Sequence, residues 1–213
     1  MKQKLNSIIY TKKNILFFVL LLVTITGLNC SVLQTITNLS RLQFKISSTS
    51  NVQLAGVSLE GKRSTGDFSS TEVLKLSTAF VRNSLPLTFT INVDAKNPND
   101  GTGGYPHTNA TIVSFPWRLF IDDKQTVTGN IGPDVTVPGT GEATVIPLQV
   151  SVDLVQFFKD KGYEGIVNLA LNLAGQGTSA SKITLYAQPT VSTDLGNIKY
   201  PNELKIVNFE YTK

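Results

Sequence analysis

Strict alternation of apolar and polar side chains is the dominant pattern in this chain. Between residues 87 and 96 every second residue is apolar, and the residues between them are polar or charged. Residues 146–154 repeat the pattern, and residues 207–211 repeat it more briefly. Because successive side chains point to opposite faces of a strand, this period predicts half-buried β-strands with one solvent-exposed face.

Weaker strand signals fill much of the remaining chain and are separated by turn residues. Asp122-Asp123 and residues 138–141 each predict a hairpin turn, and Pro116 predicts an edge or a bulge. About eight strands joined by turns indicate a mostly β fold. We expect an antiparallel β-sandwich of immunoglobulin or fibronectin-III-like type, with a barrel-like closure as the alternative. The weaker strand candidates are residues 42–46, 52–59, 110–121, 126–135 and 183–188.

Two or three short helices are predicted between the strands. Ser69 and Glu72 have the spacing of a capping box, and an apolar stripe follows them until Asn83. Residues 154–161 predict a short helix that stops at Gly162. Residues 165–174 are apolar enough for either a helix or a buried strand, and we favour the helix.

The first thirty residues have the layout of an export signal. Four lysines precede residues 15–28, a mostly apolar run without charge. A membrane-spanning helix needs about 20 apolar residues, so this run is short for one. We therefore expect residues 1–29 to be a secretory signal peptide. An uncleaved anchor and a signal without lipidation remain the alternatives.

Cys30 is the only cysteine and directly follows this run. The placement is similar to that in bacterial lipoproteins, where the thiol is acylated, although Gly27 and Asn29 depart from the usual motif. Two acyl chains hold a protein stably on a membrane, whereas one holds it marginally. We expect a lipid anchor at Cys30, a tether over residues 30–41 and a sandwich domain over residues 42–213.

The resemblance to lipoproteins implies the bacterial cell envelope as the location. Acidic residues just after the acylated cysteine favour export to the surface in some bacteria. Here the first acidic residue after Cys30 is Glu60. We therefore expect a protein on the outer membrane that faces the periplasm, with the membrane as its partner through the anchor.

The formal net charge of +4 comes entirely from the leader. Four of the 19 basic residues lie in residues 1–29, which hold no acid, so the rest of the chain has 15 basic and 15 acidic residues. A neutral domain has no long-range field that attracts phosphate backbones. We expect no nucleic-acid partner.

Candidate catalytic groups are few. His107, the only histidine, lies in a Gly-rich polar loop, and catalysis by a Ser/His/Asp or Cys/His set needs a histidine base. A zinc site needs three or four ligands, and the Asp residues do not form a calcium loop. We expect no enzyme, no cofactor and no metal. A hydrolase with two carboxylates stays open, because such pairs meet only in the fold.

Three aromatic residues lie close together on one candidate strand. Phe115 and Trp117 would share a face, and Phe120 would lie on the opposite one. We expect them in the core. An exposed aromatic patch here would instead mark a partner or ligand site.

The stretch from residue 85 to residue 154 carries a family resemblance. It runs from an alternating strand into Asn97-Pro98-Asn99, then through a loop, a strand, the Asp122-Asp123 turn and a late strand that contains Ile146-Pro147. This order resembles the type 2 late-embryogenesis-abundant (LEA type 2) family, also called the WHy domain. Departures are the Gly-rich insertion after Asn99 and Ile-Pro in place of Leu-Pro.

The resemblance implies a non-enzymatic β-sandwich with a protective or structural role under desiccation or other stress. A stable, net-neutral domain could fill that role through weak contacts with membranes or client proteins. The alternative is a binding protein that holds a lipid or another hydrophobic ligand in an apolar groove of the sandwich. Such a groove would be lined by Val73, Leu76, Phe80, Phe157 and Phe158.

The Asn97-Pro98-Asn99 tripeptide predicts a strand-ending turn. Pro98 has no N–H for a sheet ladder, and it biases Asn97 toward an extended backbone. Asn side chains bond nearby backbone groups and tolerate left-handed conformations. A ligand-binding role for the tripeptide stays open as the alternative.

Overall fold

The structure is a computed structural model of the chain, and it describes residues 41–103, 106–176, 181–193, 196–208 and 211–212. The chain divides into two compact units, Met1–Arg41 and Leu42–Lys213. The predicted signal peptide, Cys30 and all of the predicted tether except Arg41 lie outside the described residues. Every strand pair and every buried side chain that is described belongs to the second unit, so this unit has its own sheets and core.

The longest strands form one layer of the second unit. The alternation over residues 87–96 is confirmed as a strand whose five apolar side chains are at most 3% exposed. Its register with its two neighbours is continuous on one side and carries bulges on the other. All pairs in this layer are antiparallel. The sheet has the order β2-β1-β3-β8, with β1 at Gln43–Leu54, β2 at Val57–Ser58, β3 at Pro86–Lys96 and β8 at Ala143–Asp153.

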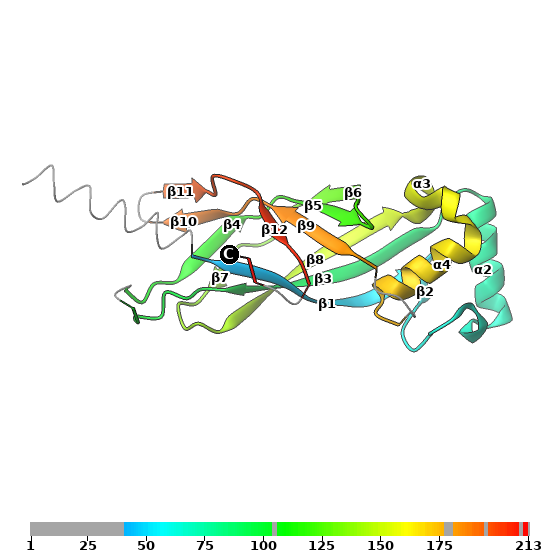
Figure 1. Cartoon of the computed structure of the whole chain (residues 1–213), viewed down its shortest axis with the longest axis horizontal. Coiled ribbons are helices and arrows are strands. Elements are labelled where there is room, and N and C mark those ends of the chain that lie inside the picture. The colour runs from blue at the N-terminus through cyan, green and yellow to red at the C-terminus, as the bar shows by residue number, and fades with distance from the viewer. Residues whose placement is uncertain (1–40, 104–105, 177–180, 194–195, 209–210, 213) are drawn as a thin grey trace, which may run out of the picture. The chain divides into compact units, whose positions relative to one another are not determined.

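Two smaller antiparallel sheets form the facing layer (Figure 1). The rings of Phe44 and Phe115 meet between the layers with centroids 5.4 Å apart, and both side chains are fully buried. The expected mostly β antiparallel sandwich is thus confirmed. One sheet has the order β11-β10-β4-β7, with β4 at Ala110–Ser114, β7 at Val135–Val137, β10 at Thr190–Thr193 and β11 at Gly196–Lys199. The other has the order β12-β9-β5-β6, with β5 at Trp117–Ile121, β6 at Lys124–Gly129, β9 at Ile183–Ala187 and β12 at Leu204–Ile206.

The helices gather at one end of the sandwich, next to the β1–β2 turn (Figure 1). The capping box is present as predicted, because Ser69 accepts from the Glu72 N–H and Glu72 accepts from the Ser69 N–H. The segment that allowed either a helix or a buried strand is a helix. The helical elements are η1 (Thr65–Asp67), α2 (Ser70–Val81), α3 (Leu154–Phe158), η2 (Lys159–Lys161) and α4 (Gly162–Leu173).

Two predicted strands are each divided in the structure. Residues 110–121 form β4 and β5, which belong to different sheets, and the break falls at Phe115-Pro116. Pro116 cannot donate to a ladder, and the Phe115 N–H donates to Asn130 Oδ1 at 2.6 Å instead of to a strand. Residues 126–135 likewise fall into the end of β6 and the start of β7.

The two predicted hairpin turns have different outcomes. Asp122 and Asp123 join the paired strands β5 and β6 with φ of 48° and 62°, as a two-residue hairpin turn requires. The hairpin expected at residues 138–141 is wrong, because β7 pairs with β4 whereas β8 pairs with β3. That segment therefore crosses from one layer to the other.

Strand ends also differ from the predictions at both termini of the unit. The candidate at residues 42–46 falls largely in β1, whose register is irregular near Ser47 and Asn51. The candidate at residues 52–59 is divided between the end of β1 and the paired strand β2. The alternation at residues 207–211 lies partly outside the described residues, which omit 209 and 210. In its described part, Asn208 forms an isolated parallel bridge with Ile46 of β1, and the Val207 carbonyl accepts from the Ile46 N–H.

The chain enters this unit at the end opposite the helices. β1 starts at Gln43 far from α2 and ends at Leu54, beside the turn that contacts Lys75 of α2 (Figure 1). None of the described helices is both long and apolar enough to span a bilayer.

Candidate functional site

Asn97 lies at the junction of the two layers, directly after the last residue of β3. Its side chain is fully buried. Nδ2 donates to the carbonyl oxygens of Thr108 and Val137, at 2.8 and 3.1 Å, and Oδ1 accepts from the Asn99 N–H at 3.2 Å. One amide thus binds the strand end, the following loop and β7 together.

The neighbouring backbone completes this tie. The Asn99 carbonyl accepts from the Thr108 N–H, and the Asn97 carbonyl accepts from the Gly141 N–H, each at 3.2 Å. At Gly139 a Cβ atom would lie 2.4 Å from the Asn99 oxygen and 2.5 Å from the Thr108 oxygen. Only glycine fits between these two carbonyl groups. The tripeptide motif therefore faces the protein's own backbone.

The remaining candidates for chemistry do not come together. His107 is an exposed loop residue. Asp122 pairs with Lys161 at 3.6 Å, and Asp123 pairs with Lys182 at 2.7 Å. Within the described ranges, no three His, Cys, Asp or Glu residues gather closely enough to hold a metal ion. Cys30 lies outside the described residues.

The expected core position is confirmed for two of the three aromatic residues, although the predicted strand that carries them is divided at Phe115-Pro116. Phe115 and Trp117 are buried, whereas Phe120 is half-buried and its ring packs on that of Tyr186, with centroids 5.2 Å apart. The Arg118 guanidinium lies over both of these outer rings and binds Glu203 at 2.5 Å. Hydrogen bonding to Glu203 raises the pKa of Arg118, and the same bond lowers the pKa of Glu203.

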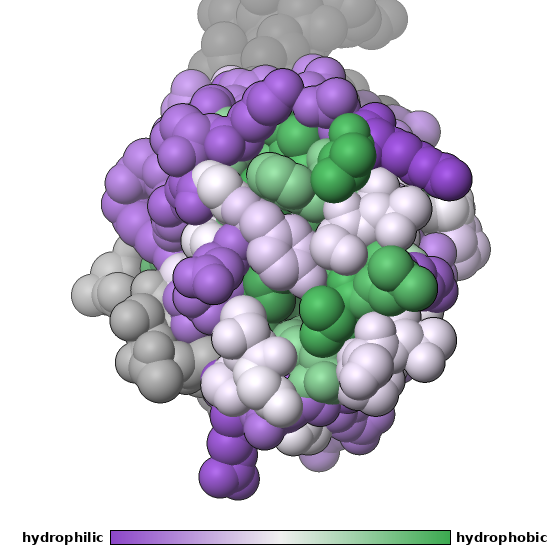
Figure 2. Space-filling view, turned by 90° about the vertical axis from the view of Figure 1, so that its right-hand side faces the viewer, coloured by the Kyte–Doolittle hydropathy of each residue, from purple (hydrophilic) through white to green (hydrophobic). Residues whose placement is uncertain are grey.

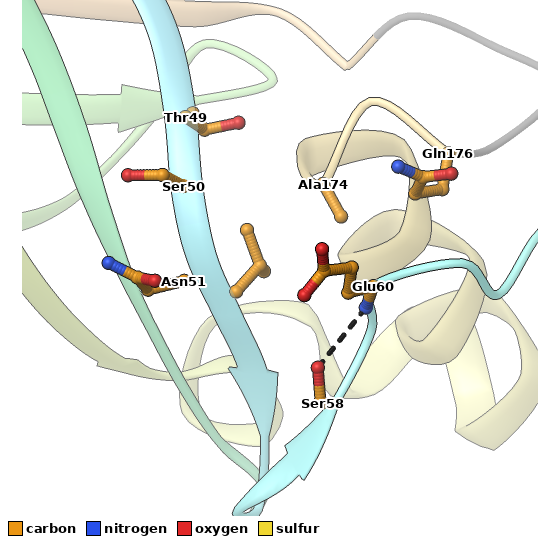
Figure 3. A pocket seen from close by; sticks show the side chains of 8 residues that line it. Thr49, Ser50, Asn51, Ser58, Glu60, Ala174 and Gln176 are labelled. Atoms are coloured by element: carbon orange, nitrogen blue, oxygen red, sulfur yellow. Dashed lines mark hydrogen bonds between the residues drawn. The ribbon is translucent and has the colours of Figure 1, made fainter.

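A polar hollow of about 310 Å³ lies between β1 and the C-terminal end of α4 (Figure 3). Two of its groups serve the fold, because Thr49 Oγ1 donates to the Leu173 carbonyl at 2.9 Å and Ser58 Oγ accepts from the Glu60 N–H at 3.3 Å. Its lining suits small hydrogen-bonding solutes or water. No local pattern predicted it, since its residues are Thr49, Ser50, Asn51, Val52, Ser58, Glu60, Ala174 and Gln176.

A second hollow, of about 490 Å³, runs along the outer face of α2. Its two charged residues are Lys75 and Arg82. Lys75 Nζ donates to the Gly56 carbonyl at 3.2 Å and so links the helix to the β1–β2 turn. The lining consists of Ala55, Thr71, Leu74, Lys75, Thr78, Ala79 and Arg82.

The outer side of α2 is unusually apolar for a solvent-exposed helix. Leu74 and Val81 are 67% and 77% exposed, and Val73 is 40% exposed. Figure 2 shows the helical end of the unit with apolar patches among near-neutral residues, inside a hydrophilic rim. The sequence carried a signal for this face, because Leu74 and Val81 lie beside the stripe that predicts the buried side.

The five residues expected to line an apolar groove lie in three different environments. Leu76 and Phe158 are buried in the core, and Val73 is exposed. Phe80 and Phe157 are half-buried. The Phe80 ring packs edge-on against Tyr163 of α4, with centroids 5.6 Å apart.

No protein-family model and no curated protein matches this chain. Among solved structures, a crystal structure of a protein from Archaeoglobus fulgidus is similar at 12% identity and a TM-score of 0.31, over 76% of this chain and 99% of that one. A solution structure of a protein from Arabidopsis thaliana is similar at 13% identity and a TM-score of 0.28, over 60% of this chain and 74% of that one. Likenesses this distant carry no argument about function.

Proposed function

We propose that this chain is a lipid-anchored envelope protein that presents a non-catalytic LEA type 2-like domain with a protective or structural role. The observation that supports it best is the set of hydrogen bonds that the Asn97 side chain makes. Both asparagines of the tripeptide behind the family resemblance are buried, and the Asn97 amide holds three backbone segments together, so this amide serves the fold.

The anchoring part of the proposal rests on the order of charge, apolar run and cysteine before the domain. Lysines, then residues 15–28 without charge, then Cys30 is the order of a lipoprotein leader. The sandwich begins at Leu42. A short tether would therefore link an acylated Cys30 to the start of β1.

The non-catalytic part rests on the described polar side chains. The histidine that a nucleophilic mechanism needs lies exposed in a loop. Asp153 caps α3 and also accepts from the Leu85 N–H, so its carboxylate has a structural use. The carboxylates of Asp122 and Asp123 each form an ion pair with a lysine.

A Cys30→Ala variant expressed in the native host tests the proposal. We expect wild-type protein in the membrane fraction after a carbonate wash, with an intact mass that includes acyl chains and lacks residues 1–29. The variant protein should move to the soluble fraction. Host cells that carry it should survive drying less well than cells with the wild-type protein. Wild-type protein that keeps an unmodified Cys30, or a variant that protects as well as wild type, would contradict the proposal.

A second candidate, binding of a small hydrophobic ligand, is favoured by the hollow beside α2. Its volume of about 490 Å³ is within the range of small-molecule sites, and Ala55, Leu74 and Ala79 give it apolar walls. Native mass spectrometry of residues 42–213 purified from the host tests this candidate. A reproducible bound lipid would support it, and protein without a bound lipid would contradict it.

A further inference from the structure

The exposed apolar side chains of this unit are concentrated on one helix. Four large apolar side chains are strongly exposed among the described residues, and three of them, Val73, Leu74 and Val81, lie on α2. The fourth, Val145, lies on β8. Contiguous exposed apolar surface on a folded protein marks a place of contact.

The charges beside these side chains have one sign. Lys75 and Arg82 are the charged residues that line the hollow along α2. The acidic residue of the helix, Glu72, is turned away into the capping box and binds Lys62 at 3.0 Å. The outer face of α2 therefore combines aliphatic side chains with two cations.

We infer that α2 docks onto the surface of an anionic lipid bilayer. A helix that lies on a membrane places aliphatic side chains at the boundary of headgroups and acyl chains and places Lys and Arg against the phosphates. Leu74 and Val81 supply the aliphatic contact, and Lys75 and Arg82 supply the phosphate contacts. Val73 widens the apolar side of the same helix.

The charges argue against a second copy of the chain as the occupant. A twofold contact through α2 would bring the same surface onto itself, with Lys75 and Arg82 from both copies and without carboxylates from the hollow. An anionic surface instead neutralises both cations.

The shape favours a bilayer over a single bound lipid. Val81 is 77% exposed and does not line the hollow, and Leu74, which lines it, is still 67% exposed, so both side chains project largely outward. Figure 2 shows apolar patches spread across the helical end of the unit. Apolar patches spread over this end of the unit fit the flat surface of a bilayer better than a single lipid molecule.

This contact goes beyond the proposed function and is separate from Cys30. Residues 42–213 contain every described strand pair and every described buried side chain, so they can be studied without the leader and the anchoring cysteine. Failure of the docking would leave the lipidation proposal untouched, and failure of lipidation would leave the docking untouched.

The experiment is co-sedimentation of residues 42–213 with large vesicles. We expect binding to vesicles of equal parts phosphatidylcholine and phosphatidylglycerol, and weak binding to pure phosphatidylcholine. Leu74→Glu should weaken the binding by about tenfold or more, because it removes an aliphatic contact and adds a repelled charge. Lys75→Glu and Arg82→Glu should each weaken it by about fivefold. High salt should reduce the contribution of both cations.

Matched controls lie elsewhere on the unit. Val145→Glu adds a charge at another exposed valine, and Lys199→Glu reverses an exposed charge on β11, away from the helices. Both should bind vesicles like wild type. Circular dichroism checks that each variant keeps its fold.

Three results would overturn the inference. One is equal binding to anionic and neutral vesicles, and another is anionic binding that Leu74→Glu leaves unchanged. The third is a protein that does not sediment with vesicles but that dimerises or binds dispersed single lipids, if Leu74→Glu abolishes that dimerisation or lipid binding.

Discussion

The side-chain amide of Asn97 donates to the carbonyl oxygen of Val137, 3.1 Å away, and so joins the end of β3 in one layer to the end of β7 in the other. Asn97 is fully buried, so water cannot replace the bond. The same nitrogen also binds the Thr108 carbonyl. This amide is thus a cross-link between the layers as well as the end of a strand.

Replacement of Asn97 with alanine should destabilise the domain by about 2–4 kcal/mol, because it leaves buried carbonyl and N–H groups without partners. Urea unfolding followed by Trp117 fluorescence measures the change. Asn202→Ala, at an exposed loop position, is the control and should stay within about 0.5 kcal/mol of wild type. An Asn97→Ala midpoint equal to that of the control would contradict the tie.

Gly139→Ala should destabilise the domain or prevent its folding. Its Cβ would lie 2.4 and 2.5 Å from two backbone oxygens, which cannot move as a flexible side chain does. A strained core insertion costs about 1–3 kcal/mol or more. Gly132→Ala is a matched control, because a Cβ at that position has no neighbour within 4 Å. Soluble yield and thermal unfolding compare the two, and equal stability would show that the segment is free to shift.

Glu72→Gln should lower the melting temperature at neutral pH but not in acid. The Ser69 backbone N–H and then Lys62 lower the pKa of Glu72 below its ordinary value of 4.5. Between the lowered pKa and pH 4.5 the folded state therefore binds fewer protons than the unfolded state. The stabilisation by the Glu72 carboxylate is present above pH 4.5 and is lost as the pH falls through the lowered pKa. Thermal melts at neutral pH and at about pH 3 test this. Glu142→Gln, an exposed carboxylate in the turn before β8, is the control. A difference between wild type and Glu72→Gln that persists in acid would contradict the linkage.

Alkali should destabilise the domain through Tyr200. Burial raises the pKa of this phenol above its ordinary value of 10, although a hydrogen bond to the Leu42 backbone partly opposes the shift. The unfolded chain releases this proton above pH 10 and the folded chain does not, so stability falls as the pH rises beyond 10. Tyr200→Phe should flatten that fall between about pH 8 and pH 11 in urea titrations. An unchanged slope would show that other groups cause it.

Local patterns predicted much of the fold. The alternation over residues 87–96 predicted which side chains of β3 are buried, and the spacing of Ser69 and Glu72 predicted where α2 begins. The Asp122-Asp123 pair likewise predicted the turn between β5 and β6. Each signal depends on neighbours within a few residues, where backbone geometry alone sets the period or the cap.

Other features depend on residues that are distant in sequence. The tripeptide predicted a strand end, but the alternation says nothing of Val137 or Thr108 as partners of Asn97. The outer face of α2 was visible only as apolar residues beside the main stripe. Whether Leu74 is exposed depends on which side of α2 packs against the core, which its own period leaves open.

The amino-acid sequence alone accounts for the buried and exposed faces of β3, the start of α2 and the tight β5–β6 turn. Three-dimensional packing accounts for the division of residues 110–121 at Phe115-Pro116 between two sheets, for the crossing at residues 138–141, and for the exposed side of α2. The physical reason is the distance along the chain over which each kind of signal acts. Periodicity and capping are set within a turn or two of the backbone, whereas sheet partners are chosen by side chains that meet only when distant segments pack together.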